Sequence, residues 1–224
     1  MSEQTDDVKA RIMNKGVIVA GHPRSGTSLA CQLLETAGVD FPSDFDGDEY
    51  NRGGYYELAR SKKLSKKLIN EAMTIENTRE MNAVVESLNE YSGWSGLKLV
   101  RVAALFFYRH IARNLKAVFV YRNPADVKSS LLRRGISKFR PAWVENNNAL
   151  IAGFENIEDS IIISYETLLQ GGEQARKKFA SLGFDVDLDI INPEHRTQEQ
   201  SRIMITEDEK RLYKILQKIE KEEI

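Results

Sequence analysis

The stretch that decides the fold is GVIVAGHPRSGTSLACQLL, residues 16–34. An apolar run at residues 17–20 predicts a buried strand, which ends at Gly21. A loop then leads to Gly26, and the residues after it have the apolar spacing of an amphipathic helix. Because the N–H groups of such a loop and the positive end of the helix dipole converge on one point, this stretch predicts an anion site.

The cation of this loop does not stand where nucleotide-hydrolysing enzymes have theirs. The spacing from Gly21 to Gly26 fits G-x-x-x-x-G-K-[ST], but Thr27 replaces the lysine. The cation of the loop is Arg24 instead. Without a lysine that reaches the β- and γ-phosphates, ATP or GTP chemistry is disfavoured, while the anion cradle remains. A strand–loop–helix joint that binds no ligand is the alternative.

The composition excludes several classes of protein. The chain has 224 residues, 42% hydrophobic and 29% charged, which fits one globular domain over residues 1–224. A net charge of −1 gives no basic field for nucleic acid. No apolar run is long enough to span a membrane and the acidic N-terminus is unlike a signal peptide, so we expect a cytoplasmic protein. The single cysteine, Cys31, excludes an intrachain disulfide and is expected in the core.

Predicted strands and helices alternate along the rest of the chain. Strands are expected at residues 96–100, 116–121 and 160–164, and helices at 56–72, 79–89, 103–115, 124–135, 140–156, 165–182 and 206–222. Residues 1–14 are expected to form a lead-in, and the charges of the C-terminal segment 203–224 are expected to face solvent. The alternation predicts an α/β, three-layer fold with a central parallel sheet flanked by helices and ligands at the C-terminal ends of its strands.

Two of these segments carry further expectations. In the helix at 103–115, Leu105, Phe106 and Ile111 are expected to face the core. Residues 40–54 form a long loop with five acidic residues, and loops of this length in compact domains are usually functional. Their spacing does not fit a calcium-binding EF-hand loop, so we expect no metal there.

A second anion site is predicted at the end of the strand at residues 116–121. Arg122 follows this strand, and Ser130 shares a face of the next helix with Asp126 and Arg133. An arginine at a strand end and a hydroxyl on the helix can converge on one anion, and a charged hydrogen bond of this kind contributes about 1.5–3 kcal/mol. An ion pair between Arg122 and Asp126 is the alternative. Two neighbouring anion sites indicate a ligand with two separated phosphate groups.

Three sequence blocks resemble those of the sulfotransferase superfamily that uses 3′-phosphoadenosine 5′-phosphosulfate. Residues 21–28 (GHPRSGTS) resemble its 5′-phosphosulfate loop, residues 118–127 (VFVYRNPADV) with Ser130 its 3′-phosphate motif, and residues 164–169 (SYETLL) the block after the third strand. Less specific blocks, GYYE at 54–57 and WSGLKLVR at 94–101, are similar to segments of bacterial members. The resemblance implies a P-loop-like fold and transfer of a sulfuryl group to a hydroxyl of a carbohydrate or small-molecule acceptor.

The resemblance also implies a role for each matching residue. Ser25, Gly26, Thr27 and Ser28 would hold the 5′-phosphate, Arg24 would contact the bridging oxygen and the leaving phosphate, Arg122 and Ser130 would bind the 3′-phosphate, and Tyr165 would contact the adenine. The loop cation and loop dipoles would stabilise the phosphate left behind in the product, adenosine 3′,5′-bisphosphate. Because a sulfuryl group carries less charge than a phosphoryl group, no metal is expected.

The acceptor hydroxyl needs a base, and three residues are candidates. We choose Glu57 in the GYYE block, because a carboxylate beside the loop can accept the proton. His22, in the loop, and His110, on a predicted helix, are the alternatives, and His22 is also expected to contact the substrate. Lys98 and Arg101, at a strand end, are expected to bind the acceptor or sulfate, with a surface ion pair as the alternative.

Departures from the family pattern leave parts of the site open. The second bacterial block lacks the Asp and Pro of W-G-L-K-D-P-R, and the C-terminal R-K-G element that adds 3′-phosphate contacts is not visible. Arg133, Arg134 and Arg196 are candidates to replace it, and residues 193–202 are candidates to cover the nucleotide. A P-loop nucleotide or small-molecule kinase and a non-catalytic nucleotide-binding relative are the alternative functions.

Overall fold

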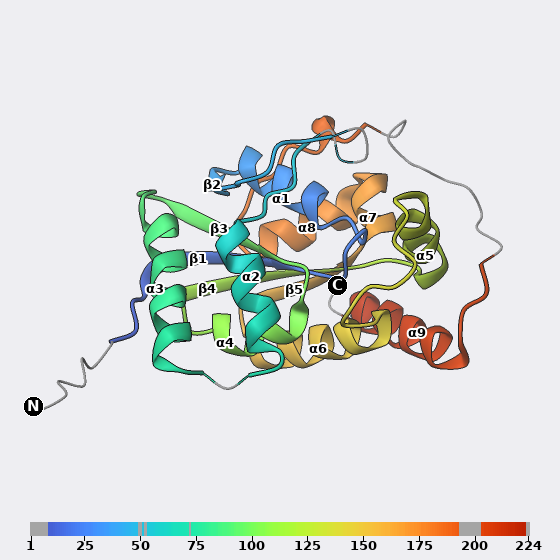
Figure 1. Ribbon diagram of the computed structural model, residues 1–224. Coiled ribbons are helices and arrows are strands. Elements are labelled where there is room, and N and C mark those ends of the chain that lie inside the picture. The colour runs from blue at the N-terminus through green and yellow to red at the C-terminus, as the bar shows by residue number, and fades with distance from the viewer. Residues whose placement is uncertain (1–8, 49–50, 52, 72, 193–202, 223–224) are drawn as a thin grey trace, which may run out of the picture.

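The computed structural model describes residues 9–48, 51, 53–71, 73–192 and 203–222. Its five strands form one parallel sheet between two layers of helices (Figure 1). This is the three-layer α/β fold that the alternation of strands and helices predicts. Within these residues, no helix is long and apolar enough to cross a membrane.

The central strand of the sheet is β1, Met13–Ala20, which leads directly into the loop of residues 21–26, the predicted anion loop. The strand order is β2-β3-β1-β4-β5, with β2 Val39–Asp40, β3 Trp94–Leu99, β4 Ala112–Tyr121 and β5 Ser160–Ser164. At its carboxyl end, Ala20 of β1 lies opposite Leu99 of β3 and Phe119 of β4. The carboxyl ends of these three strands therefore meet at one edge of the sheet, where open α/β sheets bind ligands.

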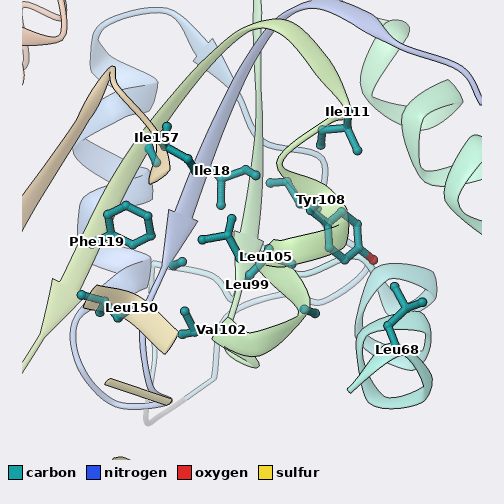
Figure 2. Close-up of a cluster of buried hydrophobic side chains, with 14 of the residues drawn as sticks. Ile18, Leu68, Leu99, Val102, Leu105, Tyr108, Ile111, Phe119, Leu150 and Ile157 are labelled. Atoms are coloured by element: carbon teal, nitrogen blue, oxygen red, sulfur yellow. The ribbon is translucent and has the colours of Figure 1, made fainter. Parts of the chain in front are cut away.

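Alternate residues of β1 face opposite layers of helices. Val17 and Val19 pack in one cluster, to which α1 (Thr27–Thr36), α7 (Tyr165–Gln170) and α8 (Glu173–Ser181) contribute. Ile18 and Ala20 pack in the other, with α2 (Ala59–Leu68), α3 (Ile75–Asn89), α4 (Leu105–Tyr108), α5 (Pro124–Arg133), α6 (Trp143–Asn156) and α9 (Glu207–Glu222). Figure 2 shows part of this second cluster, with Ile18 at its centre. The sheet is thus buried on both faces, as parallel sheets usually are.

Local capping signals set the start of two helices. The side chain of Asn123 accepts a hydrogen bond from the N–H of Ala125 at 2.9 Å, and Pro124 occupies the first position of α5. The carboxylate of Glu145 accepts from the N–H of Ala142 at 2.7 Å, so α6 begins at Trp143, directly after Ala142, and not at residue 140. The first signal was readable in the sequence, and the second shifts a predicted boundary.

The helix predicted at residues 103–115 is wrong over most of its length. α4 ends at Tyr108, and β4 begins at Ala112, which pairs with Met13 of β1. Phe106, expected in the core, is 62% exposed. Pairing with the central strand is a tertiary interaction, and here it overrides the helical spacing of the apolar residues.

Other boundaries differ from the predictions by smaller amounts. Residues 165–182 hold two helices, because α7 ends at Gln170 and α8 begins at Glu173. β1 includes Met13 and Asn14, inside the expected lead-in. Two 3₁₀ turns lie at Val102–Ala104 and Leu188–Ile190.

The C-terminal helix α9 buries charge that the sequence pattern assigns to a solvated face. Glu209 and Glu220 are only 6% and 5% exposed. Glu209 forms an ion pair with Lys128 of α5 at 2.7 Å. Leu212 and Leu216 pack in the same core cluster as the sheet. Glu220 accepts a hydrogen bond from the backbone N–H of Ser164 at 2.9 Å, so both buried carboxylates have structural partners.

Candidate functional site

Gly26 shapes the loop between β1 and α1. It has a φ of +95° and precedes the first residue of α1, Thr27. A Cβ atom at this position would lie 2.4 Å from Cδ2 of Tyr165, so the tyrosine ring packs directly on the loop. The first N–H groups of α1 have no intrahelical acceptor, and the helix dipole adds partial positive charge there. Both the backbone conformation and the aromatic neighbour require glycine.

A cavity of about 420 Å³ lies at the carboxyl ends of the central strands. Its size is within the usual range of small-ligand sites. Most residues predicted from the sequence line it, namely Arg24, Gly26, Thr27, Ser28, Glu57, Lys98, Arg122, Ser130 and Tyr165. Leu169, Ile190 and Ile191 add apolar surface. The structure therefore brings the two predicted anion positions and the GYYE block into one site.

Arg24 connects the loop to α5. Its Nε donates to Ser130 Oγ at 3.0 Å, and its carbonyl accepts from Arg122 Nη1 at 3.3 Å. Burial lowers the pKa of Arg24, and the nearby charges of Arg134 and Arg122 lower it further. Two neighbouring guanidinium groups therefore repel that of Arg24 in a partly buried site, and a bound anion would relieve that repulsion.

Arg122 and Tyr165 form a stacked pair at the side of the cavity. The guanidinium carbon of Arg122, which is 6% exposed, lies 4.2 Å from the centroid of the Tyr165 ring. Its buried Nε has no hydrogen-bond acceptor among the described residues. The ion pair with Asp126 that the sequence left open does not form within that part of the chain. An unmet donor on a buried cation favours a ligand that supplies the acceptor, such as a phosphate.

Lys98 connects the loop to the GYYE block. Its Nζ donates to Ser28 Oγ at 3.0 Å and to the carbonyl of Tyr55, and lies 3.3 Å from Glu57 Oε1. Glu57 Oε2 lies 2.9 Å from Nζ of Lys62. The side chains of Lys98 and Glu57 are only 3% and 10% exposed. This is a buried ion pair beside the cavity, so the surface ion pair considered for Lys98 is wrong.

The surroundings of this pair keep Glu57 ionised. Burial alone would raise the pKa of Glu57, but Lys98 and Lys62 outweigh it and hold the pKa below its ordinary value of 4.5. Burial lowers the pKa of Lys98, and the charge of Glu57 partly opposes that effect. Glu57 is therefore a carboxylate at neutral pH, able to accept a proton although weaker as a base than a group with a pKa near 7.

Arg101 lies next to Glu57 but outside the lining of the main cavity. Together with Glu57 and Lys98 it lines a separate pocket of about 10 Å³, room for about one water molecule. Its guanidinium carbon lies 5.4 Å from the centroid of the Phe139 ring. Arg101 therefore does not line the main cavity, and its expected contact with the acceptor stays a prediction.

Two predicted loop residues turn away from the cavity. His22 is 2% exposed, with Nδ1 2.9 Å from the carbonyl oxygen of Pro23 and its ring edge-on to Phe139. Burial lowers the pKa of His22 to about 4. Ser25 is fully buried, and its N–H donates to the carbonyl of His22 at 3.1 Å. The other candidate base, His110, is exposed and does not line the cavity. Its Nε2 accepts a hydrogen bond from Arg109 Nε at 3.0 Å.

The acidic loop at residues 40–54 makes contacts that sequence reasoning missed. Asn51 Nδ2 donates to Ser28 Oγ at 3.0 Å. Asp48 accepts from Arg134 Nη2 at 3.0 Å and from the hydroxyl of Tyr55 at 2.5 Å. Within the described residues, no group of three or more His, Cys, Asp or Glu side chains is placed to hold a metal ion. The sequence offered two signals for these contacts, the acidic residues of the loop and the arginines at the end of α5.

Two of the three arginines considered for further phosphate contacts line the cavity. Arg134 does so while paired with Asp48, and Arg133 lies one turn after Ser130 on α5. Arg196 and residues 193–202, expected near the nucleotide, lie outside the described residues. The end of α5 therefore supplies the additional cations of the described site.

Comparison with known proteins identifies the fold. No protein-family model and no curated protein matches the sequence. Among solved structures, the sulfotransferase domain from the Synechococcus PCC 7002 olefin synthase matches with a TM-score of 0.61 at 16% identity, over 97% of this chain and 98% of that one. The chain has a sulfotransferase fold. The match covers nearly the full length of both chains, so it includes the helical layers as well as the sheet.

Two other solved structures are more distant. The sulfotransferase from Alicyclobacillus acidocaldarius has a TM-score of 0.45 at 15% identity, over 92% of this chain and 93% of that one. Retinol dehydratase in a complex with retinol and PAP has a TM-score of 0.45 at 14% identity, over 82% of this chain and 65% of that one. The chemistry of a chain depends on the residues of its site and not on its fold alone.

Proposed function

We propose that the protein transfers a sulfuryl group from 3′-phosphoadenosine 5′-phosphosulfate to a hydroxyl of a carbohydrate or small-molecule acceptor. The observation that carries this proposal is the meeting of Arg24, Arg122 and Ser130 in one cavity that also contains the anion loop. Two joined cationic positions suit a nucleotide with anionic groups at both its 5′ and 3′ ends. The sulfotransferase fold supports the same proposal.

In this proposal the donor lies across the strand ends. The N–H groups at Thr27 and Ser28, in the first turn of α1, bind the 5′-phosphate. Arg122 and Ser130 bind the 3′-phosphate, and Tyr165 contacts the adenine. The fit of the 3′-phosphate rests on the buried Arg122 Nε, which lacks an acceptor among the described residues. Arg133, one turn after Ser130, adds a second cation at that end.

The transfer step assigns one task to each remaining residue. The acceptor oxygen forms a bond to sulfur while the bond from sulfur to the bridging oxygen breaks, and its electron pair stays on the 5′-phosphate. The backbone of Arg24 lies in the loop, and its side chain reaches Ser130. The charge of its guanidinium group can therefore stabilise the leaving bisphosphate. The Glu57 carboxylate, kept ionised by Lys98, takes the proton of the acceptor hydroxyl.

Thermal unfolding separates this proposal from a kinase. Adenosine 3′,5′-bisphosphate at about 100 times its Kd should raise the Tm by roughly 5–10 °C, because a ligand at that concentration adds about 2.7 kcal/mol of stability. ATP with Mg²⁺ at the same concentration should produce a smaller shift. A shift with ATP and Mg²⁺ alone would contradict the proposal.

A transfer assay then separates an enzyme from a non-catalytic relative. The protein is incubated with radiolabelled donor and a panel of mono- and oligosaccharides and small alcohols, and sulfated products are resolved by chromatography. Transfer to a member of the panel supports the enzyme. Tight bisphosphate binding with no transfer to any hydroxyl would favour the relative that only binds the nucleotide.

A further inference from the structure

A buried carboxylate from α9 joins the ends of two neighbouring strands. Glu220, in the last turn of α9, is 5% exposed. Its Oε1 accepts from the backbone N–H of Ser164 at 2.9 Å, and its Oε2 accepts from the hydroxyl of Tyr121. Tyr121 is the last residue of β4 and Ser164 the last of β5. Each oxygen of Glu220 therefore holds one strand end.

The two residues that Glu220 holds come directly before two residues of the proposed nucleotide site. Tyr121 and Ser164 are register partners in the sheet, and Arg122 and Tyr165 follow them. Ser164 also starts α7, because its Oγ accepts from the N–H of Thr167 at 3.0 Å. A displacement at this position would move the Arg122 guanidinium and the Tyr165 ring relative to each other.

The hydrogen bonds of Glu220 compensate for a burial that is otherwise unfavourable. A carboxylate that leaves water without partners is strongly destabilising, and packing by apolar residues alone would attach α9 at lower cost. Leu212 and Leu216 already provide such packing. Burial and the charge of Glu220 raise the pKa of Tyr121, so its hydroxyl remains a hydrogen-bond donor at neutral pH. β5 is one of the two edge strands of the sheet, and Glu220 supplies the acceptor for its last N–H.

We propose that Glu220 is a positioning residue of the nucleotide site, which fixes the ends of β4 and β5 so that Arg122 and Tyr165 stay stacked and directed at the ligand. This inference rests on the proposed function for the identity of the ligand. Glu220 itself does not line the cavity and acts through its two hydrogen-bonded neighbours. The last turn of α9 thereby becomes part of the support of the 3′-phosphate position.

The test compares three variants by binding and by one structural signal. Glu220→Ala removes both acceptors, and Glu220→Gln keeps the shape. In the glutamine variant the amide oxygen can accept from Ser164 while the amide N–H donates to the Tyr121 oxygen. Leu216→Ala is the matched control, because it removes buried contacts one turn earlier on the same helix and keeps both hydrogen-bond acceptors of Glu220.

Calorimetric titration should show that Glu220→Ala binds adenosine 3′,5′-bisphosphate about tenfold more weakly than wild type. The loss is of this size because a displaced Arg122 would lose only part of its charged contact with the phosphate. Affinity for adenosine 5′-phosphate, which lacks the 3′-phosphate, should fall much less. Glu220→Gln should recover most of the affinity. Leu216→Ala should lower the Tm but keep the ratio of the two affinities.

A ligand-free signal makes the inference testable apart from the proposed function. The Arg122 guanidinium lies over the Tyr165 ring, so its Nε–H resonance should carry a ring-current shift. Glu220→Ala should lose this shift, and Leu216→Ala should retain it. Wild-type resonance and affinity in Glu220→Ala, or equal losses in Leu216→Ala, would overturn the inference. Failure of wild-type protein to bind the bisphosphate would instead refute the proposed function, and the resonance would still decide whether Glu220 holds the pair.

Discussion

Arg122 and Tyr165 stack on each other with 4.2 Å between the guanidinium carbon and the ring centroid. This contact follows from the sheet, because the preceding residues, Tyr121 and Ser164, are paired in register at the ends of parallel strands. The same ring packs on Gly26. One aromatic side chain thus contacts both the predicted anion loop and the cation of the second predicted anion position.

Arg122→Ala should weaken binding of adenosine 3′,5′-bisphosphate roughly 10- to 150-fold, because charged hydrogen bonds to phosphate contribute about 1.5–3 kcal/mol. Arg122→Lys should restore only part of the affinity, because an ammonium lacks the planar fork of guanidinium. Calorimetric titration at fixed salt gives the dissociation constants. Arg176→Ala is the control, since this exposed arginine lies on α8 outside the cavity lining. Wild-type affinity in Arg122→Ala would contradict the assignment of the 3′-phosphate to this residue.

Gly26→Ala should both destabilise the protein and weaken bisphosphate binding. The new Cβ would lie 2.4 Å from the Tyr165 ring, in a backbone conformation with φ of +95°. Gly38→Ala is the matched control at the other end of α1, because Gly38 has φ of +81° and no neighbour within 4 Å of a Cβ. Backbone strain alone should cost the control about 1–2 kcal/mol. Equal urea midpoints for the two variants would show that the ring tolerates the added methyl group.

The sequence predicted features whose signals lie within a few residues of one another. The loop after β1 and the capped start of α5 at Asn123 are of this kind. The strand at residues 160–164 has its predicted bounds. The helix predicted at residues 103–115 was wrong because Ala112 pairs with Met13, about 100 positions away in the chain, and this pairing decides the conformation. Local propensity describes a segment correctly only where tertiary pairing agrees with it.

The partners of buried charges could not be predicted from the sequence. Lys98 bonds to Ser28, 70 positions away, and Tyr121 to Glu220, 99 positions away. Neither separation has a periodic or motif signal. His22 illustrates the reverse case, in which the motif was right but the side chain points into the protein, where its burial lowers its pKa. A motif predicts a backbone path more reliably than the direction of each side chain on it.

Glu57→Gln should leave bisphosphate affinity unchanged and reduce transfer about 100-fold or more, because the amide cannot accept the acceptor proton. Steady-state rates at saturating donor measure this. In the wild type, the transfer rate should fall only below about pH 4.5, since Lys98 and Lys62 hold the pKa of Glu57 below its ordinary value. Lys62→Gln should raise that pKa and move the acid limb to higher pH. Transfer at the wild-type rate in Glu57→Gln would assign the base to another group.

Lys98→Met should lower the free energy of unfolding by about 3 kcal/mol at neutral pH, because it leaves a buried carboxylate with one partner fewer. The pKa of Glu57 in the folded protein lies below its ordinary value, so the stabilisation is present above that value and is lost as the pH falls through the folded pKa. Urea unfolding at neutral pH and at about pH 3.5 should therefore show a deficit that shrinks in acid. The Glu57→Gln/Lys98→Met double variant should lose less than the sum of the single losses. A deficit of the same size at both pH values would mean that Lys98 stabilises the protein through packing and not through the charge of Glu57.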